Sequence, residues 1–257
     1  FFYLRGLIMY IESAENKKVK LWQSLNIKKN RIKEKKFLLE SIRGIEEGLK
    51  TGFMPLNIIL KEGTDIPESI DQDGLPQIVL TEELFNKISQ TEKSQGVIGV
   101  YGFLEYKLKD LMKKKVLFLD SIQDPGNLGT IIRTGAALGI GGILLGPGCV
   151  DLYNDKVLRS SLGGLFSLPI VSVEYEDLKL FKKNNYNIIA MDLEGIKLSD
   201  YTFQEKTVII IGNENKGISE AARKLTDSFI NIPISEGMES LNASIAAAIV
   251  MYELNVV

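Results

Sequence analysis

Six short apolar runs recur through the second half of the chain, and a segment of helical character follows each of them. The runs are rich in Val, Ile, Leu and Phe, and they lie at residues 116–119, 141–145, 169–173, 187–191, 207–211 and 229–233. Strands that alternate with helices in this way pair in parallel, and helices then cover both faces of the sheet. We therefore predict an α/β fold with a mostly parallel sheet, closed by a helix over about residues 240–254.

Three of these runs lead into segments that carry amide, acidic or hydroxyl side chains. The first is followed by a Pro-Gly turn, Asn127 and, six residues on, Arg133; the run at 207–211 is followed by Gly212-Asn213-Glu214; the last leads to Ser240-Leu241-Asn242. Ligands of open α/β sheets bind at the carboxyl ends of the strands. We expect Asn127 and Ser240 to act as helix caps, which would place these side chains at that edge.

The residue inventory excludes several kinds of catalytic site. The chain has no histidine and one cysteine, Cys149, which rules out Ser-His-Asp and Cys-His catalysis and argues against a metal site. The turn Asp-Pro-Gly-Asn-Leu-Gly lacks the glycine spacing of a dinucleotide-binding fold, and no Gly-Lys-Ser/Thr of a P-loop occurs. Apolar runs are shorter than the ~20 residues needed to span a bilayer. We expect a cytoplasmic protein without metal or membrane segment.

Taken together, the three segments resemble the ordered motifs of the SpoU–TrmH class of SPOUT RNA 2′-O-methyltransferases. The similarity covers about residues 113–257. It implies a C-terminal trefoil knot, a homodimer built through the C-terminal helix, and S-adenosylmethionine as cofactor. The adenine and methionine parts of that cofactor would lie against the backbone at Gly212, Ile232 and Leu241.

The same resemblance implies a catalytic set, which consists of Asn127, Arg133, Glu214, Ser240 and Asn242. Arg133 is the expected clamp on the target phosphate; because a guanidinium stays protonated, it would stabilise negative charge rather than act as a base. Glu214 would orient Arg133 or hydrogen-bond the ribose or the cofactor. The two asparagines and Ser240 would hold loops or the nucleotide through hydrogen bonds.

The first half of the chain differs in charge and in pattern. Residues 1–50 carry 12 lysines and arginines against six glutamates, which indicates either a solvated pair of amphipathic helices or a phosphate-contacting surface. Residues 37–101 alternate short strands and helices, and the stretch 37–49 resembles the ribosomal-protein-like substrate-binding domain fused to SpoU enzymes. Ser41 stands where that family usually has glycine, which puts a glycine-specific RNA contact in doubt.

We therefore predict an RNA substrate-binding domain over residues 9–105, a polar linker over 107–115 and a SPOUT catalytic domain over 113–257. The opening eight residues lack an initiator methionine, and Met9 reads as a natural start.

The leading functional hypothesis is S-adenosylmethionine-dependent methylation of a ribose 2′-hydroxyl in RNA. The N-terminal resemblance favours 23S ribosomal RNA. A tRNA 2′-O-methyltransferase, a non-catalytic RNA-binding ribosome-assembly factor and an unrelated Rossmann-type enzyme remain as alternatives. The target nucleotide, and a role in ribosome maturation or in antibiotic resistance, stay open.

Overall fold

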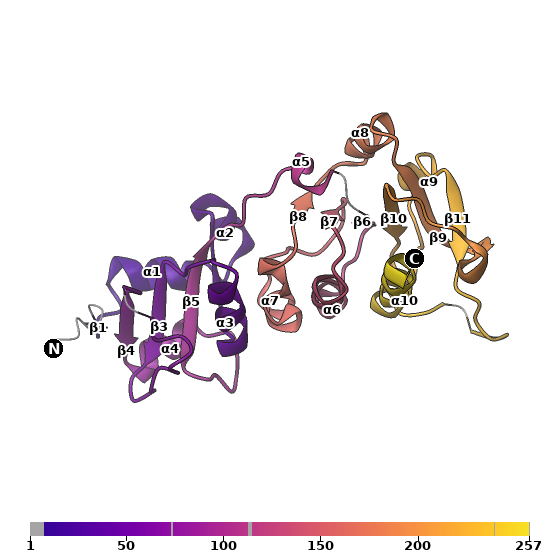
Figure 1. Cartoon of the computed structure of the whole chain (residues 1–257). Coiled ribbons are helices and arrows are strands. Elements are labelled where there is room, and N and C mark those ends of the chain that lie inside the picture. The colour runs from indigo at the N-terminus through magenta and orange to yellow at the C-terminus, as the bar shows by residue number, and fades with distance from the viewer. Residues whose placement is uncertain (1–7, 73, 113–114, 239, 257) are drawn as a thin grey trace. The chain divides into compact units, whose positions relative to one another are not determined.

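The computed structural model describes residues 8–72, 74–112, 115–238 and 240–256, and it divides into two compact units. The first unit comprises the chain up to Leu104 together with Asp151–Phe166, and the second comprises Glu105–Val150 and the chain from Ser167 onward. Each unit is built around its own sheet (Figure 1).

The sheet of the first unit has the strand order β1-β4-β3-β5-β2. The strands are β1 (Ile8–Ile11), β2 (Lys36–Leu39), β3 (Asn57–Lys61), β4 (Gln77–Leu80) and β5 (Val97–Gly102). β1, β4 and β3 run parallel to one another, whereas β5 is antiparallel to both of its neighbours. The four strands predicted between residues 37 and 101 are confirmed within a residue or two, and β1 is an additional strand at the sheet edge.

The basic N-terminal block forms the two helices that its pattern predicts, α1 (Lys17–Ser24) and α2 (Lys28–Glu34). Trp22, on α1, is buried in a cluster with Ile59 of β3 and Phe85. Phe85 belongs to α4 (Glu82–Ile88), and α3 (Ile42–Lys50) is the remaining helix of the N-terminal stretch. Trp22 is therefore a core residue, and the positive charge of this block is carried by the exposed lysines around it.

The segment Asp151–Phe166 completes the core of the first unit although it lies far along the chain. It contains α7 (Asp155–Ser161) and the short 3₁₀ helix η1 (Gly164–Phe166). Tyr153 stacks between Phe37 and Phe103, with ring centroids 4.6 and 4.0 Å apart. Arg31 forms a largely buried ion pair with Asp151 over 2.6 Å, which ties α2 to the start of this segment.

The sheet of the second unit has six strands in the order β11-β9-β10-β6-β7-β8, and every neighbouring pair is parallel. The strands are β6 (Val116–Leu119), β7 (Ile143–Leu145), β8 (Ile170–Ser172), β9 (Asn187–Lys197), β10 (Thr207–Ile211) and β11 (Ser228–Asn231). All six correspond to the apolar runs of the sequence, so the predicted parallel α/β sheet is confirmed. β9 continues six residues beyond its predicted end.

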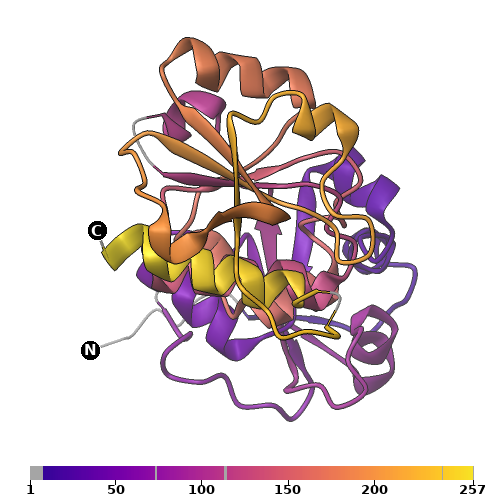
Figure 2. The same cartoon turned by 90° about the vertical axis from the view of Figure 1, so that its right-hand side faces the viewer.

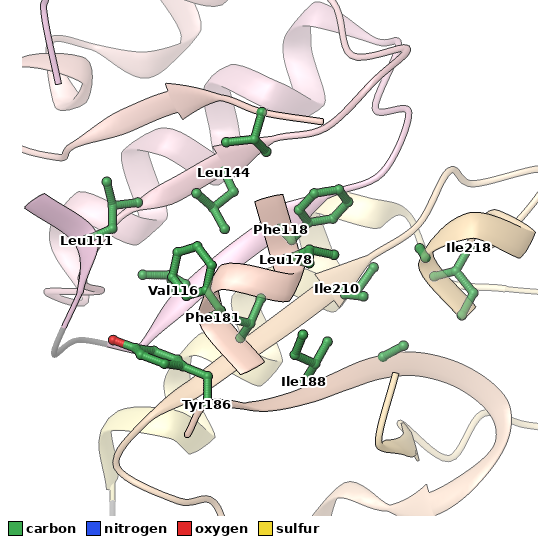
Figure 3. Packing of buried hydrophobic residues seen from close by; sticks show 14 residues of the cluster. Leu111, Val116, Phe118, Leu144, Leu178, Phe181, Tyr186, Ile188, Ile210 and Ile218 are labelled. Carbon is green, nitrogen blue, oxygen red and sulfur yellow. The ribbon is translucent and has the colours of Figure 1, made fainter. Parts of the chain in front are cut away.

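Helices cover both faces of this sheet. Figure 3 shows one face, where Phe118 and Ile210 pack with Leu178 and Phe181, the last two from α8 (Leu178–Lys183). α6 (Pro125–Ala137) and α10 (Ala243–Val256) pack against each other on the opposite face, where Figure 2 shows α10 lying across the strands.

The linker prediction is wrong where the structure describes residues 107–115. Leu108–Leu111 forms the short helix α5, and Leu111 is fully buried in the cluster of Figure 3. Leu108 and Leu111 share one helical face because they are three residues apart, so apolar contact outweighs the polar character of the neighbouring lysines. Residues 113–114 lie outside the described ranges.

Candidate active site

The three predicted loop segments meet at the carboxyl edge of the second unit's sheet through one chain of side-chain hydrogen bonds. Asn242 donates from Nδ2 to Oδ1 of Asn127 over 3.0 Å, and Asn127 donates from its own Nδ2 to Oε1 of Glu214. The first turn of α6, the loop after β10 and the residue before α10 are thus joined through a single amide.

The two helix caps differ from those predicted at Asn127 and Ser240. Asp124 caps α6, because its Oδ1 accepts from the backbone N–H of Asn127 over 2.8 Å and Pro125 follows it at the first helical position. Asp before Pro is a stronger start signal than an asparagine inside the turn, so Asn127 lies in the first turn with its side chain free to pair.

Asn242, rather than Ser240, caps α10. Its Oδ1 accepts from the backbone N–H and the hydroxyl of Ser244 over 2.9 and 2.6 Å. Ser240 lies two residues earlier and is exposed. Asn242 therefore has two functions, since its oxygen caps a helix while its amide group reaches Asn127.

Arg133 lies six residues after Asn127 on α6, with an exposed side chain. Within the described ranges it forms no hydrogen bond or ion pair. The carboxylate of Glu214 binds Asn127, so the pairing of Glu214 with Arg133 that was one of its two expected roles is not present in the single chain. The guanidinium is available to a ligand.

The loop after β10 is a tight turn that presents Glu214. Asn213 and Gly217 exchange backbone hydrogen bonds of 3.0 and 2.9 Å, and Gly217 has a φ of +64°. A Cβ on Gly212 would lie 2.4 Å from the carbonyl carbon of Gly217, so only glycine fits there. This close approach explains why the strand breaks at that position.

A cavity of about 850 Å³ opens beside this loop. Its lining includes Gly212, Ile232 and Leu241, the three positions expected to contact the cofactor, together with Glu214 and Ser240. Its volume is in the range of small-molecule sites. Asn127, Arg133 and Asn242 do not line it, so Glu214 is the member of the hydrogen-bonded chain that reaches the cavity.

The polar walls of the cavity include residues that the sequence analysis did not select. Asp192 and Glu194 come from the extended part of β9, and Asn231 comes from the end of β11. Asn231 donates from Nδ2 to the carbonyl oxygens of Leu193 and Gly195 over 3.1 and 2.7 Å. Its Oδ1 is buried and, within the described ranges, accepts no hydrogen bond.

Asn213 is a further residue that sequence analysis left outside the site. Its Oδ1 accepts from the backbone N–H groups of Asn215 and Lys216 over 3.0 and 3.2 Å, and its Nδ2 donates to the carbonyl oxygen of Ser121 over 2.9 Å. An asparagine directly after a strand-ending glycine is typical of a side chain that closes its own turn, and that signal was available.

Within the described ranges, no group of three or more His, Cys, Asp and Glu side chains is arranged to hold a metal ion. None of the helices in those ranges has the length and apolar character that crossing a bilayer demands.

Comparison with known proteins identifies the family. Residues 114–252 match the SpoU rRNA methylase family, and residues 16–99 match a domain described as an MRM3-like substrate binding domain. The chain is 37% identical to the 23S rRNA (guanosine(2553)-2′-O)-methyltransferase RlmP of Bacillus subtilis (strain 168), over 95% of this chain and 98% of that protein. It is 29% identical to the 23S rRNA (uridine(2479)-2′-O)-methyltransferase of Streptomyces viridochromogenes, over 94% of this chain and 90% of that protein.

The solved structures show the same architecture. The crystal structure of the SpoU methyltransferase AviRb from Streptomyces viridochromogenes, in complex with the cofactor AdoMet, aligns with a TM-score of 0.84 and 27% identity. The alignment covers 93% of this chain and 97% of AviRb. With the family match over more than half of its length and a relative of 37% identity, the chain belongs to the SpoU rRNA methylase family and is a methyltransferase.

Proposed function

We propose that this protein transfers a methyl group from S-adenosylmethionine to a ribose 2′-hydroxyl of 23S ribosomal RNA. The observation that carries the proposal is the chain Asn242–Asn127–Glu214 beside a cavity lined by Gly212 and Leu241. The relatives named above support the choice of reaction and of RNA.

The cavity suits S-adenosylmethionine in its size and in its polar groups. The carboxylates of Glu194 and Glu214 favour a positively charged ligand, whereas that of Asp192 is paired with Arg223, which also lines the cavity. Gly212, Ile232 and Leu241 would hold the cofactor along their backbone. Bound there, S-adenosylmethionine supplies an electrophilic methyl group, which leaves the protein to orient the hydroxyl and manage its proton.

Glu214 orients the ribose hydroxyl, and Arg133 binds the target phosphate and stabilises negative charge. The hydrogen bond from Asn127 fixes the Glu214 carboxylate at the cavity wall, where it accepts a hydrogen bond from the ribose hydroxyl. Arg133 stays protonated because a guanidinium has a pKa above ~12, so it clamps the target phosphate and stabilises negative charge. Asn127 and Asn242 hold the loops in place, and Ser240 binds the nucleotide or cofactor through its hydroxyl.

The protein acts as a homodimer through its second unit. Ile245 and Tyr252 lie seven residues apart on α10, hence on one face, and are 51% and 59% exposed. This exposed apolar face of α10 is where we place the contact with the second subunit. The small-residue run Ala246-Ala247-Ala248 permits close helix approach on the same helix. As in the family that the motifs resemble, the C-terminal segment forms a trefoil knot and RNA is bound across both subunits.

The chain is organised as an RNA substrate-binding domain over residues 9–105 and a SPOUT catalytic domain over residues 113–257. Exposed lysines of α2 and the residues after it, including Lys28, Lys29 and Lys35, form a positive surface that contacts RNA phosphates. Because its substrate is ribosomal RNA, we place the enzyme in the cytoplasm.

The proposal is tested by transfer of a tritiated methyl group from labelled S-adenosylmethionine to total RNA from a strain that lacks this protein. We expect label in 23S RNA, confined to one nuclease fragment. Label in tRNA would mean that the protein is an RNA methyltransferase whose substrate is tRNA rather than 23S RNA. If no RNA is labelled although calorimetry shows cofactor binding, the catalytic role is wrong and the non-catalytic assembly factor is favoured.

A further inference from the structure

Asp120 is a fully buried carboxylate that the proposed mechanism does not use. It follows β6 directly, and its backbone N–H continues the strand ladder by donating to the carbonyl oxygen of Ile211 over 2.9 Å. Tyr175 donates its hydroxyl to Oδ1 over 2.7 Å, and the backbone N–H of Ser219 donates to Oδ2 over 2.6 Å. A buried carboxylate is costly unless such donors surround it, so both hydrogen bonds contribute to the local structure.

The contact with Ser219 closes one end of the segment 212–219. The other end is closed by the neighbour of Asp120, because Asn213 donates from Nδ2 to the carbonyl oxygen of Ser121 over 2.9 Å. Ser121 is itself fixed, since its hydroxyl donates to the carbonyl oxygen of Pro147 over 3.0 Å and its φ of +59° is left-handed. Two consecutive residues at the end of the central strand thus hold both ends of the loop.

This loop contributes a continuous wall of the cavity, because every residue from Gly212 to Ile218 lines it. It also carries Glu214, whose carboxylate accepts from Asn127. The position of the loop therefore sets both the shape of the cavity and the alignment of the carboxylate.

The Tyr175 hydroxyl stays protonated at neutral pH and therefore remains a hydrogen-bond donor to Asp120. Burial is the main reason that the pKa of Tyr175 lies above its ordinary value, and the Asp120 carboxylate raises this pKa further. The hydroxyl consequently keeps its proton at neutral pH. Tyr175 belongs to the 3₁₀ helix η2 (Tyr175–Asp177), so the carboxylate joins three segments that are distant in the sequence.

We propose that Asp120 is a positioning residue for the methyl donor: it holds the loop 212–219 in the form that binds S-adenosylmethionine and keeps Glu214 on Asn127. This inference rests on the proposed function and deepens it. Asp120 would then control cofactor affinity although its buried side chain touches neither cofactor nor RNA.

The test compares Asp120→Asn, Asp120→Ala and Tyr175→Phe with the matched control Asp227→Asn. Asp227 is also a carboxylate that accepts a backbone N–H, from Ile188 over 2.9 Å. It precedes β11, at the opposite end of the strands from Asp120. The control therefore removes a carboxylate charge and weakens the same kind of hydrogen bond away from the loop, at a more exposed position that also pairs with Lys182 over 2.6 Å.

The first measurement is hydrogen exchange of the backbone amide of Ser219 in each folded variant. A hydrogen bond to a charged group is worth a factor of about ten or more, so we expect at least about tenfold faster exchange in Asp120→Ala. Asp120→Asn should lie between Ala and wild type, because its remaining oxygen can still accept from Ser219. Asp227→Asn should leave this amide unchanged.

The second measurement is cofactor affinity by calorimetry, together with the separate KM values for cofactor and RNA. We expect the Kd and the KM for S-adenosylmethionine to rise about tenfold in Asp120→Ala, with the KM for RNA unchanged. If Asp120→Ala does not fold, Tyr175→Phe tests the inference instead, because it removes one hydrogen-bond donor without opening a large cavity. We expect Tyr175→Phe to raise the cofactor Kd severalfold relative to Asp227→Asn.

Unchanged exchange at Ser219, or an unchanged cofactor Kd in folded Asp120→Asn and Tyr175→Phe, would overturn the inference. Failure of the proposed function gives a different result, because wild-type protein would then methylate no RNA, whether or not it binds S-adenosylmethionine. In that case a rise in Ser219 exchange still supports the anchoring of the loop by Asp120, and no rise contradicts it.

Discussion

Asn127 acts through both ends of one amide, accepting from Asn242 and donating to Glu214. An amide is suited to this place because it offers a donor and an acceptor on one rigid plane. Arg133 on the same helix remains exposed, so the helix carries one residue that organises the site and one that is available to the substrate.

Replacement of Arg133 by alanine should lower kcat by at least about a hundredfold, since it removes a charge that stabilises the transition state. The melting temperature and the Kd for S-adenosylmethionine should stay near wild type, because the side chain is exposed and does not line the cavity. Arg133→Lys is the charge-matched control and should recover only part of the rate, as lysine lacks the bidentate fork. Normal turnover by Arg133→Ala would exclude the residue from the reaction.

Gly212→Ala should abolish cofactor binding, because its Cβ would lie 2.4 Å from the backbone of Gly217 and would force the loop to shift. Gly102→Ala is a matched control, since the nearest atom to its Cβ, the carbonyl oxygen of Lys35, is 4.0 Å away. Calorimetry with S-adenosylmethionine measures the difference. Equal affinity in both variants would show that the loop tolerates a side chain there.

At the level of elements, the apolar runs predicted the strands well because β6, β7 and β10 are buried along their whole length in a parallel sheet that helices cover on both faces. Element boundaries were less predictable. β9 extends through Gly195 to pair with β11, and nothing in its composition separates that extension from a polar loop. The caps were predictable only in part: Asp124 before Pro125 is the stronger start signal for α6, whereas the choice of Asn242 over Ser240 depends on where α10 begins.

The site residues were predicted by their common position at strand ends and by the family resemblance, rather than by spacing within one helix. Sequence could not predict that Glu214 contacts Asn127 instead of Arg133, because that depends on the path of the loop after Gly212. It also could not predict Asp120 or Asn231, whose significance arises from burial and from unpaired or shared polar atoms.

The lysines around α2 should provide a large part of the nonspecific RNA affinity. Changing Lys28, Lys29, Lys35 and Lys36 to glutamine should weaken RNA binding and flatten its dependence on salt, because fewer counterions are released. A control with the same loss of charge changes four exposed lysines of the second unit, Lys179, Lys183, Lys197 and Lys224. A salt slope equally affected in both variants would mean that total charge, and not this surface, determines binding.

At the level of the whole molecule, the chain order does not follow the division into units. Asp151–Phe166 lies within the part that matches the SpoU family, yet it packs in the first unit. Residues of α7 and the stacked Tyr153 are therefore needed by a core whose other members come from the first hundred residues.

Asp151→Asn should destabilise the protein by about 3 kcal/mol or more, because it leaves the buried charge of Arg31 without its partner. Glu82→Gln is the control, since it breaks the exposed ion pair with Lys61 and should cost no more than about 1 kcal/mol. Denaturant unfolding provides both values. A similarly small loss of unfolding free energy in both variants would mean that Asp151 does not anchor the segment Asp151–Phe166.

The proposed homodimer predicts that a charge on the outer face of α10 separates the subunits. Ile245→Asp combined with Tyr252→Asp should sediment as a monomer, whereas Leu180→Asp, at another exposed apolar position, should keep the mass of wild type. Analytical ultracentrifugation measures both. A dimer that survives the double change would place the interface elsewhere.

Ribose methylation by this protein can be measured by nucleoside mass spectrometry of 23S ribosomal RNA after reaction with the wild-type protein and with Arg133→Ala. We expect one new 2′-O-methylated nucleoside with wild-type protein and none with the variant. A methyl group on a base, or equal methylation by both proteins, would contradict this expectation.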